Sequence, residues 1–358
     1  GMARSAWRAP LLACGRLRRG QTGRKWCHCA AGEGAAPAAS EGDALHSFHD
    51  SRPRYRLRIA YDGTAYMGFQ FQREGKRTIQ GELESALTRI TCQDRRELRL
   101  HGAGRTDSGV HARGQVAHFT TADPLKNLAS THCGMNALLP MDVRVLELER
   151  VPSDFHARFS SVGKTYHYHI HTDPVLDPFK RMHCIHIRKP IDVERMRAAA
   201  ARFEGTWDYS AFANKTRSGR DRAAIAEGGA ERRPVRTIHR CAIVDEAGGY
   251  RFEFEGTGFL YKQVRNMVGA LLRVGYGKFS PEDITELLQR GDRCLVPSGV
   301  PARGLFLMEV MYADTPEERL EADALHRREL RLFDELVAQG RFGGRTEQQK
   351  VWRASNAS

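Results

Sequence analysis

The chain has 358 residues, of which 41% are hydrophobic, and it carries a formal net charge of +13. This length favours two domains. No apolar run approaches the roughly 20 residues that a membrane helix requires, so we expect no membrane partner. Seven positive charges lie in residues 1–32 and the last eighteen residues carry a net +3, which leaves a net +3 for the rest. The bulk charge is therefore weak evidence for a nucleic-acid partner, and local patches must supply it.

Residues 1–50 differ in composition from the remainder. They are rich in Arg, Ala and Gly and contain no acidic residue before Glu33. Their one apolar run, APLLACG, is short for a secretory signal, and the composition favours an organellar transit peptide, for a chloroplast or a mitochondrion, followed by a linker. A disordered basic arm is the alternative. The eight cysteines are scattered without a CxxC pair, which argues against a zinc site or a disulfide framework.

Regular hydrophobic patterns begin at residue 54. Alternating residues predict a strand over 54–61, and helical spacing predicts a helix that Thr78 caps. Further elements follow in the order strand, strand, helix, strand, at about 97–103, 114–120, from Pro124, and 142–151. The order β-α-β-β-α-β is typical of a ferredoxin-like domain, here residues 54–155.

The second half, residues 156–313, repeats this order. It comprises a strand over 164–172, a helix capped by Asp192, a hairpin with its turn at Gly248–Gly249, an amphipathic helix from Phe259, a helix capped by Ser280, and a strand over 304–312. We therefore predict an α/β (α+β) protein with two ferredoxin-like β-α-β-β-α-β domains packed around a central cleft, where ligands usually bind. Residues 314–358 read as a surface helix, with a capping box at Thr315 and Glu318, and a basic tail.

The stretch HGAGRTDSGVHARGQVAHF (101–119) holds Asp107 in a glycine-rich bend, two residues after Arg105. An Asp in such a bend is either a turn residue, satisfied by local hydrogen bonds, or a working carboxylate. The preceding Gly102-Ala103-Gly104 does not lead into a helix, so the dinucleotide-binding interpretation fails.

Three histidines, His101, His111 and His118, surround the same bend. They do not fall on one face of a regular element. Structural histidines are therefore favoured over a metal site with Asp107.

The stretch GRTDSGVHARGQVAHF resembles the signature of the TruA-type tRNA pseudouridine synthases. YDGTAYMGFQFQ is similar to the opening motif of that family, with Phe69 where many members have Trp. TIQGELESAL, NALLP, VPSDFHARFSSVGKTYHYHI, RTI and FLYKQVRNMVGALLRVG follow in the family's order, so the resemblance covers roughly residues 54–312. It implies an enzyme that isomerises uridine to pseudouridine in RNA without a metal or an organic cofactor.

The resemblance also implies roles for three residues. Asp107 matches the catalytic nucleophile, which must be ionised to attack the sugar C1′ or the base. Tyr166 matches a tyrosine proposed to stack on the base and move a proton. Tyr168 lies on the same side of that strand, so sidedness alone does not separate the two. Arg265 matches an arginine that pairs with the aspartate, and it lies off the apolar face of its helix.

Substrate handling rests on positive side chains. Arg105 lies where it could hold or replace a nucleotide flipped out of its stack. Lys215, Arg217 and Arg220 begin a basic stretch suited to phosphates, although a solvated insertion explains it equally well. The resemblance implies that the substrate is a uridine in the anticodon stem-loop of tRNA, of the position 38–40 type, and that the enzyme is a homodimer.

Two other functions compete with this reading. The first is an RNA-binding protein of the same fold that has lost catalysis, against which the presence of Asp107, Tyr166 and Arg265 argues. The second is an Asp-dependent glycoside or nucleoside hydrolase, which usually needs a second carboxylic acid at the bond. Apart from Asp107, no acidic residue lies in the motifs that carry Asp107, Tyr166 and Arg265, which are GRTDSGVHARGQVAHF, KTYHYHI and QVRNMVG.

Overall fold

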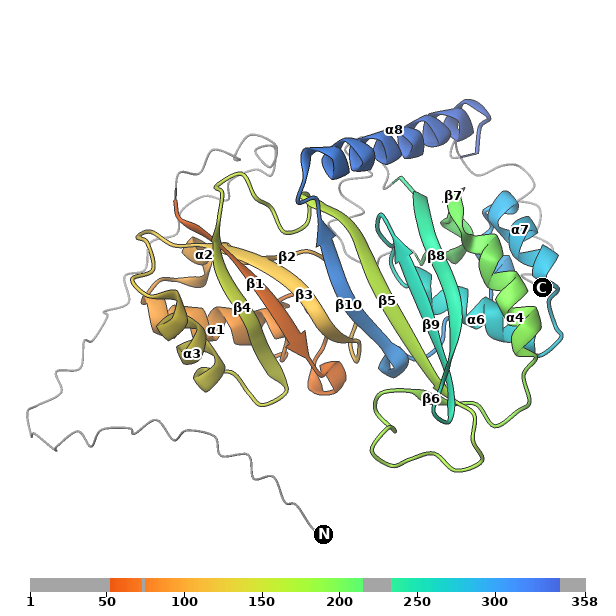
Figure 1. Cartoon of the computed structure of the whole chain (residues 1–358), viewed down its shortest axis with the longest axis horizontal. Helices are drawn as coiled ribbons and strands as arrows, with labels where there is room; N and C mark the ends of the chain where they lie inside the picture. Colours follow the sequence, from red (N-terminus) through yellow and green to blue (C-terminus); the bar gives the residue numbers. More distant parts are fainter. Residues whose placement is uncertain (1–51, 73–74, 215–232, 342–358) are drawn as a thin grey trace, which may run out of the picture. The chain divides into compact units, whose positions relative to one another are not determined.

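The computed structural model describes residues 52–72, 75–214 and 233–341 (Figure 1). The predicted transit segment, Lys215, Arg217, Arg220 and the basic tail lie outside the described residues. The described strands form one ten-stranded sheet, mostly antiparallel, in the order β4-β1-β3-β10-β5-β9-β8-β7, with β2 beside β3 and β6 beside β5. The predicted mixed α/β class is confirmed.

The first half contains the expected succession of strands and helices. Its elements are β1 (Arg54–Tyr61), α1 (Ile79–Thr91), α2 (Arg95–Leu98), β2 (His101–Gly102), β3 (His111–Thr120), α3 (Leu128–Leu138) and β4 (Val143–Val151). Thr78 caps α1 as predicted, because its side chain accepts a hydrogen bond from the amide of Gly81.

Two predicted boundaries in this half are wrong, and both errors involve caps. The strand expected over 97–103 is only β2, because Asp94 and Glu97 form a capping box that folds the preceding residues into α2. The helix expected from Pro124 begins at Leu128, because the Asn127 side chain accepts from the amide of Ser130.

The second half follows the predicted order with short additions. Its elements are β5 (Ser161–His171), β6 (Ile185–His186), α4 (Val193–Ala200), β7 (Gly205–Asp208), β8 (Val235–Glu246), β9 (Gly249–Gly256), α6 (Gln263–Gly275), α7 (Pro281–Arg290) and β10 (Leu305–Tyr312). The predicted caps Asp192 and Ser280 are confirmed. Leu260, expected in α6, lies before it, because Lys262 takes the left-handed conformation at φ 62° and the helix begins at Gln263.

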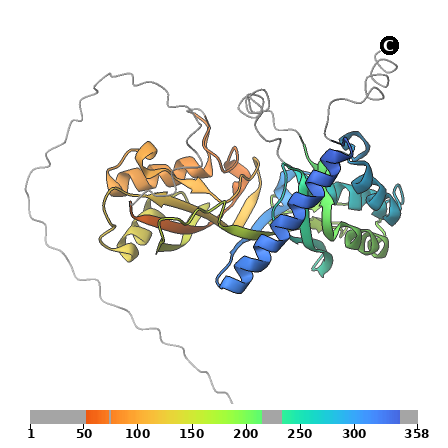
Figure 2. The same cartoon turned by 90° about the horizontal axis from the view of Figure 1, so that it is seen from above.

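The alternation of β1 separates a core face from an outer face. Tyr55, Leu57, Ile59 and Tyr61 are buried. Arg58, on the other side of the strand, donates to Glu147 of β4 at 2.6 Å, and both side chains are about half exposed. Helices α1 and α3 lie beside the strands of the first half, and α4, α6 and α7 lie beside those of the second (Figures 1 and 2). The core therefore lies between one face of the sheet and these helices.

Strand β10 joins the two halves. It runs parallel to β3, with Phe306 opposite His111 and Leu307 opposite Ala112, and antiparallel to β5 on its other side. The last of the described strands is thus inserted at the centre of the sheet. The two predicted halves therefore meet edge to edge in one continuous sheet.

Helix α8 (Pro316–Ala338) has the predicted capping box of Thr315 and Glu318. It is more than a surface helix, because Glu329 is only 8% exposed and accepts from the Thr237 amide at 2.7 Å and from the Thr257 hydroxyl at 2.6 Å. Figure 2 shows α8 running across the second half. Among the described helices, none has the length and apolar character needed to span a bilayer.

Candidate active site

The loop that carries Asp107 is held against the loop after β1. The amide of Phe69 donates to the Thr106 carbonyl at 3.1 Å, and the Ser108 hydroxyl donates to the Tyr66 carbonyl at 3.0 Å. Gly68 adopts φ +95°, and a Cβ placed there would lie 2.6 Å from the Thr106 oxygen. Only glycine permits both this backbone conformation and this close approach.

Asp107 forms a turn with its backbone but not with its side chain. Its carbonyl accepts from the Val110 amide at 3.1 Å. Its carboxylate Oδ2 instead lies 3.0 Å from Nη1 of Arg265, which comes 158 residues later in the chain. A turn-forming Asp usually bonds its own neighbouring amides. The carboxylate is therefore oriented by a distant element.

Arg265 projects from the first turn of α6. Its Nε donates to the Val300 carbonyl at 2.7 Å, and its own carbonyl accepts from the Val300 amide at 3.2 Å. The side chains of Arg265 and Asp107 are 15% and 23% exposed, so the pair is shielded but still open to solvent. A guanidinium fixed in this way sets the direction of the carboxylate.

Asn266 and Gly299 support the arginine, and the sequence analysis did not single out either. Asn266 is fully buried and donates to the Phe212 carbonyl at 2.6 Å. A Cβ at Gly299 would lie 2.6 Å from Asn266 Oδ1 and 3.2 Å from the Arg265 Cβ. A polar Asn among the apolar residues of an amphipathic helix was the available sequence signal.

Tyr166 and Tyr168 of β5 have different environments. Tyr166 is 8% exposed and packs edge-on against Phe259, with 5.1 Å between ring centroids. Its hydroxyl has no hydrogen bond within residues 52–72, 75–214 and 233–341. Burial, with smaller contributions from Tyr61 and Asp107, raises its pKa above the ordinary value, so the phenol keeps its proton. Tyr168 is fully buried, and its hydroxyl donates to the Pro301 carbonyl at 2.7 Å.

A buried polar network joins the Asp107 loop to strands β1 and β3. The Tyr61 and Thr106 hydroxyls are 2.8 Å apart, and Gln115 donates to the Gly104 carbonyl at 2.9 Å. Burial raises the pKa of Tyr61 to about 12. The sequence analysis did not identify this network. A glutamine on a core strand, Gln115 in β3, was the only signal for it.

Comparison with known proteins identifies the family of the chain. A family model described as tRNA pseudouridine synthase matches residues 58–160 and 199–313. The chain belongs to the tRNA pseudouridine synthase family. Asp107 and Arg265 lie in the two matched stretches, Tyr166 lies between them, and α8 follows the second.

Bacterial relatives match over nearly their whole length. The tRNA pseudouridine synthase A 1 of Protochlamydia amoebophila is 42% identical over 258 residues, 72% of this chain and 96% of the relative. The tRNA pseudouridine synthase A of Latilactobacillus sakei is 42% identical over 261 residues, 72% and 98% respectively. That of Ligilactobacillus salivarius is 39% identical over 269 residues, 75% and 99%.

The histidines near the bend form two groups rather than one site with Asp107. His118 clusters with His101 and His156, whose ring centroids lie 5.4 and 4.6 Å from its own. His111 lies instead with Asp62 and His183, and donor atoms of these three residues fall within 4.8 Å of one another.

The second group connects the two halves of the sheet. His111 Nε2 lies 3.0 Å from the Met182 carbonyl and 3.1 Å from that of Arg303, so it must donate. Its Nδ1 then accepts from the Gly63 amide at 3.1 Å. His183 Nε2 lies 2.8 Å from Asp62 Oδ2. We interpret Asp62, His111 and His183 as a hydrogen-bonded link between the two halves. The Gly63 amide already occupies the Nδ1 lone pair of His111 that a metal ion would need.

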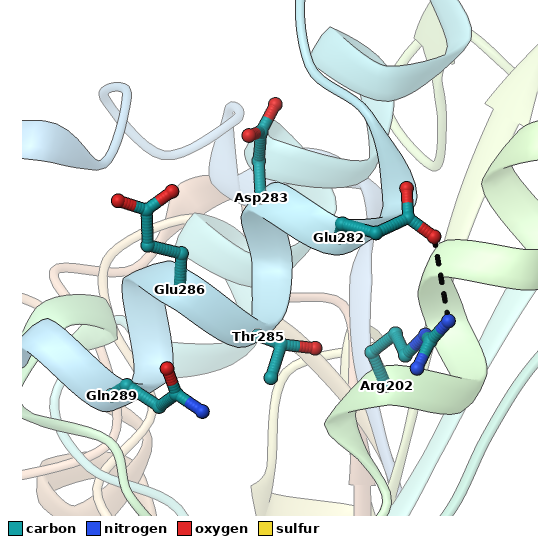
Figure 3. Close-up of a pocket in the computed structure, with 6 residues that line it drawn as sticks. All are labelled: Arg202, Glu282, Asp283, Thr285, Glu286 and Gln289. Carbon is teal, nitrogen blue, oxygen red and sulfur yellow. Dashed lines mark hydrogen bonds and ion pairs between the residues drawn. The ribbon is translucent and has the colours of Figure 1, made fainter.

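A surface pocket lies on α7 (Figure 3). Arg202, Glu282, Asp283, Thr285, Glu286 and Gln289 line it. Arg202 reaches Glu282 at 3.4 Å, and the other two carboxylates extend from the same helix. Three carboxylates against one guanidinium make this surface unsuitable for RNA phosphates.

Proposed function

We propose that this chain isomerises uridine to pseudouridine in tRNA, with Asp107 as the nucleophile. The Asp107–Arg265 pair carries the proposal: a shielded carboxylate, aimed by a guanidinium, within the matched stretches of a tRNA pseudouridine synthase. In the reaction the C1′–N1 bond breaks, the uracil turns, and a C1′–C5 bond forms. The hydrogen on C5 leaves to solvent, and N1 gains a proton.

Each side chain has a defined task in this scheme. Asp107 attacks the sugar C1′ or the base, and Arg265 holds the carboxylate in the attacking direction. Tyr166 stacks on the uracil, and its protonated hydroxyl, which lacks a protein partner in the described structure, is available to relay a proton. Arg105, on the exposed side of the Asp107 loop, holds the flipped nucleotide.

The remaining assignments concern the substrate and the assembly. We propose a uridine of the anticodon stem-loop, of the position 38–40 type, as the target, and a homodimer of chains with domains 54–155 and 156–313. Lys215, Arg217 and Arg220 would hold tRNA phosphates. Neutralising Arg217 and Arg220 together with Arg222 of the same basic stretch should then reduce the salt dependence of tRNA binding. An unchanged slope would count against that role.

Organellar targeting is proposed on composition alone. A reporter fused behind residues 1–50 should enter a mitochondrion or a chloroplast. A diffuse cytosolic signal would contradict the targeting proposal and leave the catalytic one untouched.

A tritium-release assay tests the activity. The purified chain is incubated with tRNA that carries tritium at C5 of uridine, and the released tritium, the pseudouridine positions and any free uracil are measured. We expect tritium release with pseudouridine in the anticodon stem-loop. Free uracil would indicate the hydrolase, and tRNA binding without release would indicate the inactive RNA-binding protein.

A further inference from the structure

Lys164 of β5 reaches the loop that carries the proposed nucleophile. It lies two residues before Tyr166 and therefore on the same face of the strand. Its ammonium donates to the Ala103 carbonyl at 2.8 Å, four residues before Asp107. A Cβ at Gly104 would lie only 3.1 Å from the lysine nitrogen, so the glycine leaves room for the ammonium.

The charge of Lys164 has no acidic partner in the part of the chain that the structure describes. Among the described residues, no carboxylate forms an ion pair with it, and the charged groups that act on it are the two cations Arg158 and Arg236. Burial and these cations lower the pKa of Lys164 to about 8. Lys164 is half-buried. A half-buried cation near two others is unfavourable in the free protein and favourable once an anion binds.

We propose that Lys164 binds a phosphodiester group of the RNA next to the flipped uridine. The ammonium has three N–H donors, and the Ala103 carbonyl takes one of them. The other two are available to phosphate oxygens. This inference rests on the proposed function, because a flipped nucleotide at Asp107 brings its phosphates into the site.

The competing explanation is a tether, in which Lys164 only ties β5 to the Asp107 loop. A neutral amine can still donate to the Ala103 carbonyl, so a tether does not need the positive charge. A phosphate contact does need it, because charge-assisted hydrogen bonds to phosphate are the strong ones. The two roles therefore respond differently to pH and to salt.

The test compares Lys164→Gln with the wild type by filter binding of full-length tRNA, over salt and from pH 6.5 to 9. At pH 7 we expect the Kd of Lys164→Gln to be about tenfold higher, and the slope of log affinity against log salt to be smaller by about 0.7–0.9. Lys164 loses its charge as the pH rises through about 8. The tenfold ratio between variant and wild type should therefore shrink toward one at pH 9.

Lys180→Gln is the matched control. Lys180 also donates to a backbone carbonyl, that of Ala247, but at the other end of the β8–β9 hairpin. It should bind tRNA as the wild type does, with an unchanged salt slope. Equal salt slopes for wild type and Lys164→Gln, or a ratio that stays constant from pH 6.5 to 9, would overturn the phosphate contact and leave the tether.

The outcome is separable from that of the proposed function. Filter binding measures the contribution of Lys164 to tRNA affinity whether or not turnover occurs. Pseudouridine formation by the wild type tests the proposed function. Pseudouridine formation with identical binding by Lys164→Gln would refute only the inference about Lys164. The expected binding differences without any pseudouridine would refute only the proposed chemistry.

Discussion

At the scale of single residues, side chains that the sequence pattern does not distinguish have different roles because their surroundings differ. Tyr166 and Tyr168 alternate onto the same face of β5, so periodicity could not separate them. The structure gives the Tyr168 hydroxyl a carbonyl partner and leaves the Tyr166 hydroxyl without one among the described residues. Likewise, no local pattern could pair Asp107 with Arg265. The family motifs suggested that pair, and the structure places it at 3.0 Å.

The two tyrosines should therefore respond in opposite ways to loss of the hydroxyl. Tyr166→Phe should lower the rate of pseudouridine formation and leave the free energy of unfolding nearly unchanged, because no hydrogen bond is lost. Tyr168→Phe should lower the free energy of unfolding by about 1 kcal/mol, because the buried Pro301 carbonyl loses its donor. Urea unfolding and single-turnover rates on both variants make the comparison. A stability loss confined to Tyr166→Phe would contradict it.

At the scale of elements, predictions succeeded where the signal was local. Thr78, Asp192, Ser280 and Thr315 begin the expected helices because a cap is formed by residues within one turn. Predictions failed where two local signals competed, as at α2, where a capping box opposed strand propensity. The loop geometry around Asp107 was also out of reach, because the close contact of Gly68 with Thr106 joins two loops that are distant in sequence.

That contact can be tested with two glycines. Gly68→Ala places a Cβ against the Thr106 carbonyl and should displace the Asp107 loop, and misplacement of about 1 Å costs on the order of a hundredfold in rate. Gly75 has a similar backbone conformation, φ +88°, but no atom lies within 4 Å of a Cβ built there. Gly75→Ala thus imposes the same backbone strain without the collision. Equal catalytic losses in both variants would show that the contact does not position Asp107.

At the scale of the whole described structure, the site depends on the order of strands in the sheet. Asp107 follows β2 in the first half, and Tyr166 and Arg265 come from the second half. Strand β10, inserted between β3 and β5, brings the halves into one sheet. The sequence predicted the strands but not the parallel β3–β10 pairing, because strand periodicity carries no information on a partner almost two hundred residues away.

Buried histidines should make the stability of this assembly depend on pH. Burial lowers the pKa of His118 to about 2 and that of His156 to about 4, from the ordinary 6.5. Between pH 6.5 and 4 the unfolded chain binds protons at these positions and the folded chain does not, so acidification favours unfolding.

We therefore expect the free energy of unfolding to fall between pH 7 and pH 5, as measured by urea titration. His118→Gln removes the most strongly shifted of the two groups, and its amide oxygen can accept from the Ala157 amide in place of the imidazole. The variant should show a smaller dependence on pH. An equally steep dependence in wild type and His118→Gln would exclude His118 as a source.

The central claim is that Asp107 acts as a nucleophile rather than as a turn residue. Its most direct test is single-turnover pseudouridine formation by Asp107→Asn, with tRNA affinity and thermal unfolding measured on the same protein. Asn suits a turn as well as Asp does, so the fold and the tRNA affinity should persist while pseudouridine formation disappears. Asp107→Glu keeps the charge but moves it, and should also be severely impaired. Measurable pseudouridine formation by the Asn variant would contradict the account and return Asp107 to the role of a turn residue.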